Sequence, residues 1–396
     1  MVYLVIIIFL ISPIISTPLI ILSLIIDNKN YKIYILGISF NLAFIGYYYD
    51  PIVSNDLYRH FLTMDVLKNK SFLEALFYDP LIMKNFWFYI ISKINLYNLL
   101  PFTAILIPYY LVMKDMIEFG RNQIRNNLIT VSLTLLIISW IGLIGAVSGI
   151  RFIFSIFMFF HGLYREYILK KNNLKTKFYY IIPLFIHYSI VVLFVLKFIV
   201  NVLDRIKNKS KFILLFLLSF WGVILEKNLS LIESSVLPYL NSDYFIEVNE
   251  KIIFYMDYFH TGSYYIANYY MKLFFAFILI ILCFISFKKN NIGTYNKFYL
   301  FGILSSVFII GGHNIFIIVT RYGSFLLLMM PFFMILFFKY NNIGYIKTFY
   351  FIFYIVFLLL GVYYSYIPFK KGDFDITLLD FLVNNILNLL FKLTYF

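Results

Sequence analysis

Runs of about twenty consecutive apolar residues recur along this 396-residue chain, and they constrain its fold more than any other feature. A helix needs about 20 apolar residues to cross the hydrocarbon core of a bilayer. Hydrophobic residues make up 62% of the chain and charged residues 13%, whereas a soluble domain is about half apolar and about a quarter charged. The sequence therefore predicts an all-α, polytopic helical membrane protein with no separate aqueous domain.

About ten transmembrane helices are expected, preceded in one case by an interfacial helix at 84–97. The first run lacks a basic leader and a small-residue cleavage site, so we expect it to remain as a helix. The single cysteine, Cys283, excludes an intramolecular disulfide and a cysteine zinc cluster, and the sequence predicts no metal and no cofactor. The expected spans are 3–26, 32–49, 99–113, 128–147, 149–169, 212–228, 264–287, 298–316, 320–338 and 347–367.

The loops between these runs differ in charge, which predicts their orientation. Lysine and arginine gather in segments that the positive-inside rule assigns to the cytoplasm. The segments 50–83 and 227–263 are richer in acids and are expected outside, and 368–396 resembles an amphipathic helix on the outer surface. The net charge of +14 is thus explained by membrane topology, and nucleic acid is not expected as a partner. The basic segments are 27–32, 114–127, 165–177, 204–211, 288–297 and 339–347.

Residues 178–203 are apolar but have basic clusters on both sides. A single crossing would place one cluster outside and reverse the sign of every later loop. We therefore predict a re-entrant pair or two short helices, with His187, Tyr188 and Ser189 at the outward tip. Non-helical backbone at that depth requires burial by protein or a water-filled cavity.

Several ionisable residues fall at the outer ends of the predicted spans. They are Arg151, Arg321, His187 and His313, together with the outer loop "SNDLYRH" from Ser54 to His60. Arginine presents a planar fork that matches phosphate oxygens, and a nearby carboxylate or histidine could accept a proton from an attacking hydroxyl. Aromatic residues, 22% of the chain, could stack on sugar faces. The pattern indicates chemistry on a sugar carried by a lipid pyrophosphate at the outer leaflet.

Each of these residues also has a simpler interpretation. Either arginine could be an interface anchor whose charge reaches the headgroups. His187 could be a satisfied histidine of the tip, and His313 could serve helix packing after Gly311 and Gly312. The loop residues could be ordinary solvated side chains, and His161 in the middle of its span is expected to be a core residue.

The segment "SGIRFIFSIFMFFHGLYREYILKKNNLKTKFYYIIPLFIHYSIVVLFVL", residues 148–196, resembles the EpsG/Wzy-type family of bacterial polysaccharide polymerases. Members have an Ile-Arg pair opening a helix, here Ile150-Arg151, and an aromatic-His-x-Ser stretch about 35 residues later, here at His187. They also have an Asp and a Tyr in an outer loop after the second span and a late Arg-aromatic pair. The matching residues are Asp56, Tyr58, Arg321 and Tyr322. The chain departs from the family pattern at Leu57, which interrupts the Asp-Tyr pair, and at Phe152.

This resemblance implies a type-C-like glycosyltransferase in the cytoplasmic membrane, with its active site facing outward. It would transfer a growing glycan from its polyprenyl-pyrophosphate carrier to a lipid-linked repeat unit, alongside a chain-length regulator and a flippase. Arg151 and Arg321 would bind pyrophosphate, and Asp56 and His187 would be the catalytic residues. The substrate-binding candidates are Tyr58, Arg59, His60, Ser189, His313 and Tyr322.

Three other functions remain open at this point. A flippase or transporter for the same glycan predicts polar residues along a path at mid-depth and symmetry between the two halves. A membrane acyltransferase predicts a histidine site at cytoplasmic depth, for which His161 is the candidate. A ligase that moves finished glycan to another acceptor shares the donor chemistry and differs mainly in its acceptor.

Overall fold

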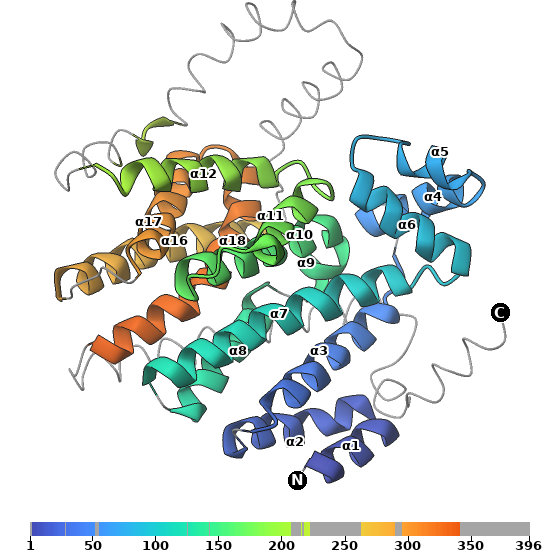
Figure 1. The fold of residues 1–396 in the computed structure, drawn as a ribbon, viewed down its shortest axis with the longest axis horizontal. Helices are drawn as coiled ribbons and strands as arrows, with labels where there is room; N and C mark the ends of the chain where they lie inside the picture. Colours follow the sequence, from blue (N-terminus) through green and yellow to red (C-terminus); the bar gives the residue numbers. More distant parts are fainter. Residues whose placement is uncertain are drawn as a thin grey trace, which may run out of the picture. The chain divides into compact units, whose positions relative to one another are not determined.

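The structure, a computed structural model, describes residues 2–27, 29–51, 55–124, 126–141, 143–206, 215, 218–221, 263–289 and 295–340. These residues form helices, and no β-strand occurs among them (Figure 1). The expected all-α class is therefore confirmed. The predictions for 347–367 and 368–396, for most of 212–228 and for nearly all of 227–263 lie outside the described residues, as does Ser54.

The chain forms two compact units, one from residues up to Val191 and the other from Val192 to Tyr340. Unit 1 has eleven α-helices and one π-helical turn in its described residues (Figure 1). They are α1 (Val2–Ile11), α2 (Pro13–Ile26), α3 (Tyr31–Tyr47), α4 (Asp56–Lys68), α5 (Phe72–Leu76), α6 (Ile82–Ile94), α7 (Leu99–Ile124), α8 (Asn127–Ile141), α9 (Leu143–Ser148), α10 (Ile150–Leu163), η1 (Tyr164–Ile168) and α11 (Leu174–Leu184).

The first expected span, 3–26, is not one continuous helix. It breaks between α1 and α2 at Ser12, whose φ of −150° and ψ of 107° are extended. Pro13 follows, and a proline ring disfavours the helical conformation of the residue before it. The Ser12 hydroxyl accepts a hydrogen bond from the Ile15 N–H at 3.4 Å and caps α2. The expectation of one continuous helix over 3–26 was therefore wrong at this proline.

Two helices in the described residues are long and apolar enough to cross a bilayer, α7 in unit 1 and α18 (Phe316–Tyr340) in unit 2. The expected span 99–113 was too short, because α7 continues to Ile124 through residues assigned to a cytoplasmic loop. The outer segment 50–83 was expected as a loop, yet it contains α4 and α5.

The segment 178–203 forms two short helices, as expected for one of the two alternatives. They are α11 and α12 (Ile190–Leu203), and His187, Tyr188 and Ser189 lie in the turn between them. Pro183 lies in the last turn of α11, and its carbonyl accepts hydrogen bonds from the backbone N–H groups of Ile186 and His187. This ends the helix and fixes the start of the turn.

An apolar core holds α6, α10 and the end of α11 together in unit 1. Phe154 and Met158 of α10 pack with Ile186, and Trp87 of α6 lies against Phe154 with ring centroids 5.0 Å apart. Gly162 of α10 admits the ring of Tyr180, since an added Cβ would lie 2.9 Å from that ring. These contacts set the position of the residues that follow Phe185.

Unit 2 contains α16 (Ser263–Lys289), α17 (Asn296–Gly311) and α18. Phe298 of α17 stacks on Phe333 of α18 at 5.1 Å. Trp221 stacks on Phe308 at 4.9 Å and donates its indole N–H to the Phe308 carbonyl at 2.9 Å. Gly311 and Gly312 leave room for the Trp221 ring, because a Cβ at either position would lie within 2.7 Å of it.

Candidate anion-binding site

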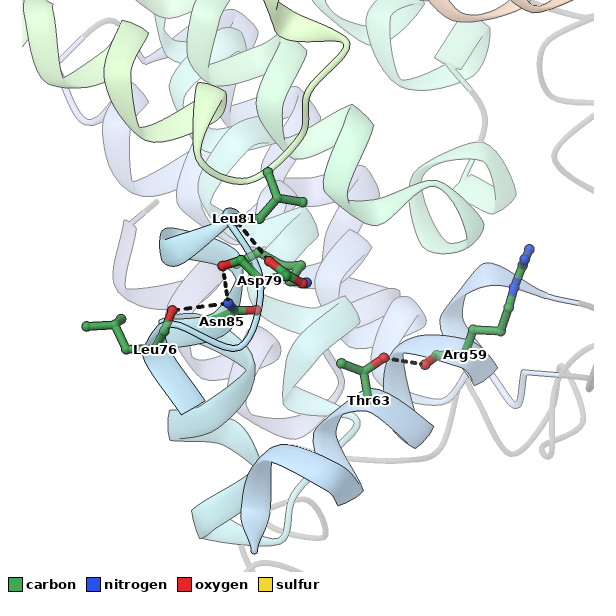
Figure 2. Close-up of polar contacts among 7 residues, drawn as sticks. Arg59, Thr63, Leu76, Asp79, Leu81 and Asn85 are labelled. Carbon is green, nitrogen blue, oxygen red and sulfur yellow. Dashed lines mark hydrogen bonds and ion pairs between the residues drawn. The ribbon is translucent and has the colours of Figure 1, made fainter. Parts of the chain in front are cut away.

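A hydrogen-bonded turn between α5 and α6 supports one side of the site (Figure 2). The Asp79 carboxylate accepts from the Leu81 N–H at 2.8 Å. The Asn85 side chain donates to the carbonyls of Leu76 and Asp79 at 3.1 and 3.0 Å. Figure 2 shows Asp79, Leu81 and Asn85 facing one another, with Arg59 of α4 apart from them. The turn is thereby fixed where α6 begins.

Lys84, in the first turn of α6, is buried, with only 4% of its surface exposed. Its ammonium pairs with the Asp79 carboxylate and lies 5.9 Å from the centre of the Phe88 ring. Its backbone N–H donates to the Phe185 carbonyl at 3.2 Å, which ties α6 to the turn after α11. Burial lowers the pKa of Lys84, Asp79 raises it, and the charge of Arg151 lowers it. Arg151 therefore lies within electrostatic range of this lysine.

His187 packs against Phe152, the residue that follows Arg151. The rings of Phe152 and His187 meet edge to face with centroids 5.4 Å apart. The Ser189 backbone N–H donates to His187 Nδ1 at 3.2 Å. A ring nitrogen that accepts carries no proton, so the neutral imidazole carries its proton on Nε2. His187 is therefore arranged to donate a hydrogen bond through Nε2.

His60 of α4 completes this group of residues. It is 7% exposed and its ring lies 5.3 Å from that of Phe88. Burial, followed by the positive charges of Arg151, Lys84, Arg59 and His187, lowers the pKa of His60 to about 2. His60 is therefore neutral, and the four residues lie within electrostatic range of it. We call Lys84 and Arg151, together with the neighbouring histidines His60 and His187, the cationic cluster, after the charges of Lys84 and Arg151.

Three residues predicted from the same outer segment behave differently. Asp56 and Arg59 form an exposed ion pair on the first turn of α4, and Tyr58 between them is half-buried. A negative charge at the first turn of a helix interacts favourably with the helix dipole. That explains Asp56 without a catalytic role. Leu57, which interrupts the family pattern, is a fully buried core residue.

The remaining predicted site residues belong to unit 2. Arg321 and Tyr322 lie in the second turn of α18, and Tyr322 packs edge to face on Phe308 at 5.5 Å. His313 is exposed between α17 and α18, and its Nδ1 lies 3.0 Å from the Ile310 carbonyl. The Tyr269 hydroxyl of α16 donates to the His313 carbonyl at 2.5 Å. His313 thus closes the end of α17, in agreement with its simpler interpretation.

A second polar pair in unit 1 joins α7 and α10. His161 is buried, as expected, but its Nδ1 lies 2.5 Å from a carboxylate oxygen of Asp115, which is 1% exposed. The Tyr179 ring meets His161 edge to face at 4.3 Å. Sequence reasoning misses Asp115 because it assigns 114–127 to a loop, where an acid needs no partner.

Comparisons of the whole chain with models of protein families, with curated proteins and with solved structures found no match to it.

Proposed function

We propose that this protein is a multi-pass membrane glycosyltransferase that joins polyprenyl-pyrophosphate-linked oligosaccharide repeat units into a polysaccharide. The observation that supports it most is that the buried Lys84 and His60 both lie against the Phe88 ring, and that the Lys84 N–H binds the Phe185 carbonyl just before His187. Arg151 is within electrostatic range of both Lys84 and His60. A group of cations at one place in a protein with bilayer-length apolar helices suits a lipid-linked anion. Membrane lipids would surround the apolar helices, with the cluster at the outer face of the cytoplasmic membrane.

The cluster offers three kinds of donor to a pyrophosphate. The Arg151 guanidinium can bind two oxygens at once. Lys84 has three ammonium protons, of which Asp79 uses one. His187 presents Nε2–H. These donors would hold the donor lipid and stabilise the negative charge that grows on its pyrophosphate as the sugar departs.

The transfer step requires a base as well as a leaving group. An acceptor hydroxyl attacks the anomeric carbon, the bond from that carbon to the pyrophosphate oxygen breaks, and polyprenyl pyrophosphate leaves with the electron pair. The hydroxyl proton goes to a base, and neutral His60 is the group of the cluster that can take it. Bound pyrophosphate would offset the cations near His60 and so raise its pKa, while burial, the larger cause of the low pKa, would continue to lower it. This role replaces those predicted for Asp56 and His187.

The test is binding and transfer by the purified full-length protein in nanodiscs. Arg151→Ala and Lys84→Met should each weaken the binding of undecaprenyl pyrophosphate at least tenfold, since each removes a charged hydrogen bond worth about 1.5–3 kcal/mol. Lys93→Met is the matched control, because Lys93 lies on the same helix α6 and donates to the exposed Lys68 carbonyl. Equal affinity in all four proteins would reject the proposal.

The acceptor distinguishes a polymerase from a ligase. The wild-type protein, incubated with one purified lipid-linked repeat unit, should produce a ladder of longer lipid-linked glycans. Product that forms only after a second kind of acceptor is added would identify a ligase that uses the same donor site. Movement of the lipid across proteoliposomes without new glycosidic bonds would identify a flippase.

A further inference from the structure

A basic segment joins η1 to α11 in unit 1, at the opposite end of α10 from Arg151. We call residues 169–178 the basic turn. They contain no acid, and the acid nearest to them in the chain, Glu166 of η1, is half-buried. The proposed transfer reaction does not use the basic turn. Its four lysines, all exposed, are Lys170, Lys171, Lys175 and Lys177.

Hydrogen bonds hold the backbone of the basic turn in place. Arg165 of η1 donates from Nε to the Thr176 hydroxyl at 3.1 Å, and its guanidinium lies 5.7 Å from the centre of the Tyr179 ring. The buried Thr176 hydroxyl donates to the Lys171 carbonyl at 2.8 Å. The Asn173 side chain accepts from the Thr176 N–H at 3.1 Å and caps α11. The lysines are therefore presented from a well-defined backbone.

Lys170 has a backbone conformation that usually belongs to glycine. Its φ of 56° is left-handed, and the N–H of the next residue, Lys171, donates to the Arg165 carbonyl at 2.8 Å. This bond is that of the Schellman motif, whose left-handed position is usually glycine. A lysine in the left-handed region is strained, so the fold does not explain why a lysine occupies this position.

Helix stability does not explain the neighbouring charges either. Lys175 and Lys177 lie in the first turn of α11, where the helix dipole favours an acid and disfavours a cation. All four lysines fall between positions 170 and 177, and like charges this close in the chain repel one another. The positive-inside rule would be satisfied equally by lysines spread along the loop. An anionic partner explains why they are concentrated here.

The exposed face of α11 is apolar and begins within the basic turn. Leu174 and Phe178 are 69% and 50% exposed, and Ile181 and Phe185 continue the stripe along the helix. Their spacing of i, i+4, i+7 and i+11 places them on one face, opposite the face whose Tyr180 packs on Phe159 of α10. With 11 residues, α11 is about 16 Å long, too short to cross a hydrocarbon core of about 30 Å.

Lysines beside an exposed apolar stripe are typical of a surface that binds the interface of an anionic bilayer. Lys175 follows Leu174 and Lys177 precedes Phe178, so the ammonium groups can reach headgroups while the apolar side chains enter the acyl region. A soluble polyanion would match the charges but would leave Leu174 and Phe178 in water. The combination favours a lipid surface over a nucleic acid or free phosphate.

We propose that the basic turn is a binding surface for anionic phospholipid headgroups, with Leu174 and Phe178 inserted among the acyl chains. The partner is the bilayer leaflet itself, and the positive-inside rule predicts the cytoplasmic leaflet. The surface requires a protein that lies in a membrane but does not require glycosyl transfer. It therefore goes beyond the proposed function, and either can fail without the other.

Two charge-matched double variants of the full-length protein in detergent provide the first test. Lys175→Gln/Lys177→Gln removes two charges from the basic turn, and Lys70→Gln/Lys93→Gln removes two from the segment of α5 and α6. Titration with dioctanoyl phosphatidylglycerol and dioctanoyl phosphatidylcholine measures binding. The wild type should bind the anionic lipid at least tenfold more tightly, and only the first variant should lose most of this preference. Equal affinities of the two double variants for phosphatidylglycerol would overturn the proposal.

Lys170→Gly separates a structural role from lipid binding. Glycine relieves the left-handed residue and removes one charge, so the variant should melt at or above the wild-type temperature. Its affinity for dioctanoyl phosphatidylglycerol should fall several-fold. Wild-type affinity, or a loss of affinity accompanied by a lower melting temperature, would show that this lysine only shapes the turn and would contradict its place in the surface.

Spin labels test whether the apolar residues enter the bilayer. Cys283 is buried, so a label attaches preferentially to an exposed cysteine introduced by Leu174→Cys or, as the control, Asn172→Cys. In nanodiscs that contain phosphatidylglycerol, the label at position 174 should be more accessible to oxygen than to a water-soluble nickel complex, and the label at 172 should show the reverse. Two labels that are equally accessible to the nickel complex would overturn the insertion.

A titration with undecaprenyl pyrophosphate distinguishes this surface from a substrate site. Lys175→Gln/Lys177→Gln should bind it as the wild type does, because the cationic cluster is unchanged. A loss of affinity for undecaprenyl pyrophosphate, with phosphatidylglycerol binding unchanged, would assign the basic turn to the substrate and overturn the proposal. Loss of phosphatidylglycerol binding in this variant, with none of undecaprenyl pyrophosphate binding in Arg151→Ala, would reject the cationic cluster and leave this surface standing.

Discussion

One hydrogen bond determines what His187 can do. The Ser189 N–H occupies His187 Nδ1, so the neutral ring donates through Nε2 and has no free lone pair to accept a proton there. The sequence predicted His187 as a site residue and suggested that it acts as a base. The tautomer could not be predicted, because it depends on the conformation of a three-residue turn.

The role of His187 as a donor predicts different behaviour for its two amide substitutions. The amide nitrogen of glutamine can reach the position of Nε2, whereas that of asparagine reaches only the position of Nδ1. His187→Gln should therefore retain most of the affinity for undecaprenyl pyrophosphate, and His187→Asn should lose about tenfold. Isothermal titration of both variants measures this. Equal losses would show that Nε2–H does not contact the ligand.

The buried neutral imidazole of His60 predicts a pH dependence of stability. Its pKa is about 2 in the folded protein and about 6.5 when unfolded. Between these values the unfolded chain binds a proton and the folded chain does not, so stability falls as the pH drops below 6.5, by up to about 1.4 kcal/mol per pH unit. The effect is absent above pH 7.5. Unfolding free energies at pH 7.5 and 5 should differ less in His60→Gln than in the wild type, and equal differences would contradict the neutral state.

At the scale of helices, the contact of α10 with α11 sets the distance from Arg151 to His187. Gly162→Ala would place a methyl group 2.9 Å from the Tyr180 ring and should destabilise the protein by about 1–3 kcal/mol. Gly145→Ala is the control, since nothing lies within 4 Å of its added Cβ and alanine favours helix. Thermal unfolding in one detergent compares them. A melting temperature unchanged by Gly162→Ala would mean that α11 is not packed as described.

The pair of Asp115 and His161 joins α7 to α10 through a buried hydrogen bond of 2.5 Å. Removing one partner leaves the other buried without its hydrogen bond, so Asp115→Leu or His161→Phe should cost at least about 1–3 kcal/mol. The double variant should be less destabilised than the sum of the two single variants by more than about 1 kcal/mol. A double-mutant cycle measured by unfolding checks this coupling. Additive losses would show that the two side chains do not interact.

Hydrophobic runs predicted the positions of most described helices but not their ends. The runs at 32–49, 264–287, 298–316 and 320–338 correspond to α3, α16, α17 and α18. Apolarity alone does not show where a proline interrupts a run, so it predicts one helix over 3–26. The charged residues of 114–127 predicted a cytoplasmic loop. The segment instead continues α7 to Ile124, and Asp115 is buried against His161 of α10.

At the scale of the whole molecule, the sequence predicts site residues that lie close together in the chain. It misses residues whose burial depends on contacts with other segments. The pairing of Arg151 with His187 follows from the family resemblance of residues 148–196, in which α10 and α11 connect the two residues. Lys84 could not be found in this way, since its burial depends on a turn built by Asp79 and Asn85.

The most direct test of the central proposal is an experimental structure of the full-length protein in a nanodisc with undecaprenyl pyrophosphate. We predict density for the pyrophosphate within hydrogen-bonding distance of the Arg151 guanidinium, Lys84 Nζ and His187 Nε2, and its absence in the Arg151→Ala protein. A pyrophosphate bound elsewhere, with Arg151 directed at bulk lipid headgroups, would contradict the account.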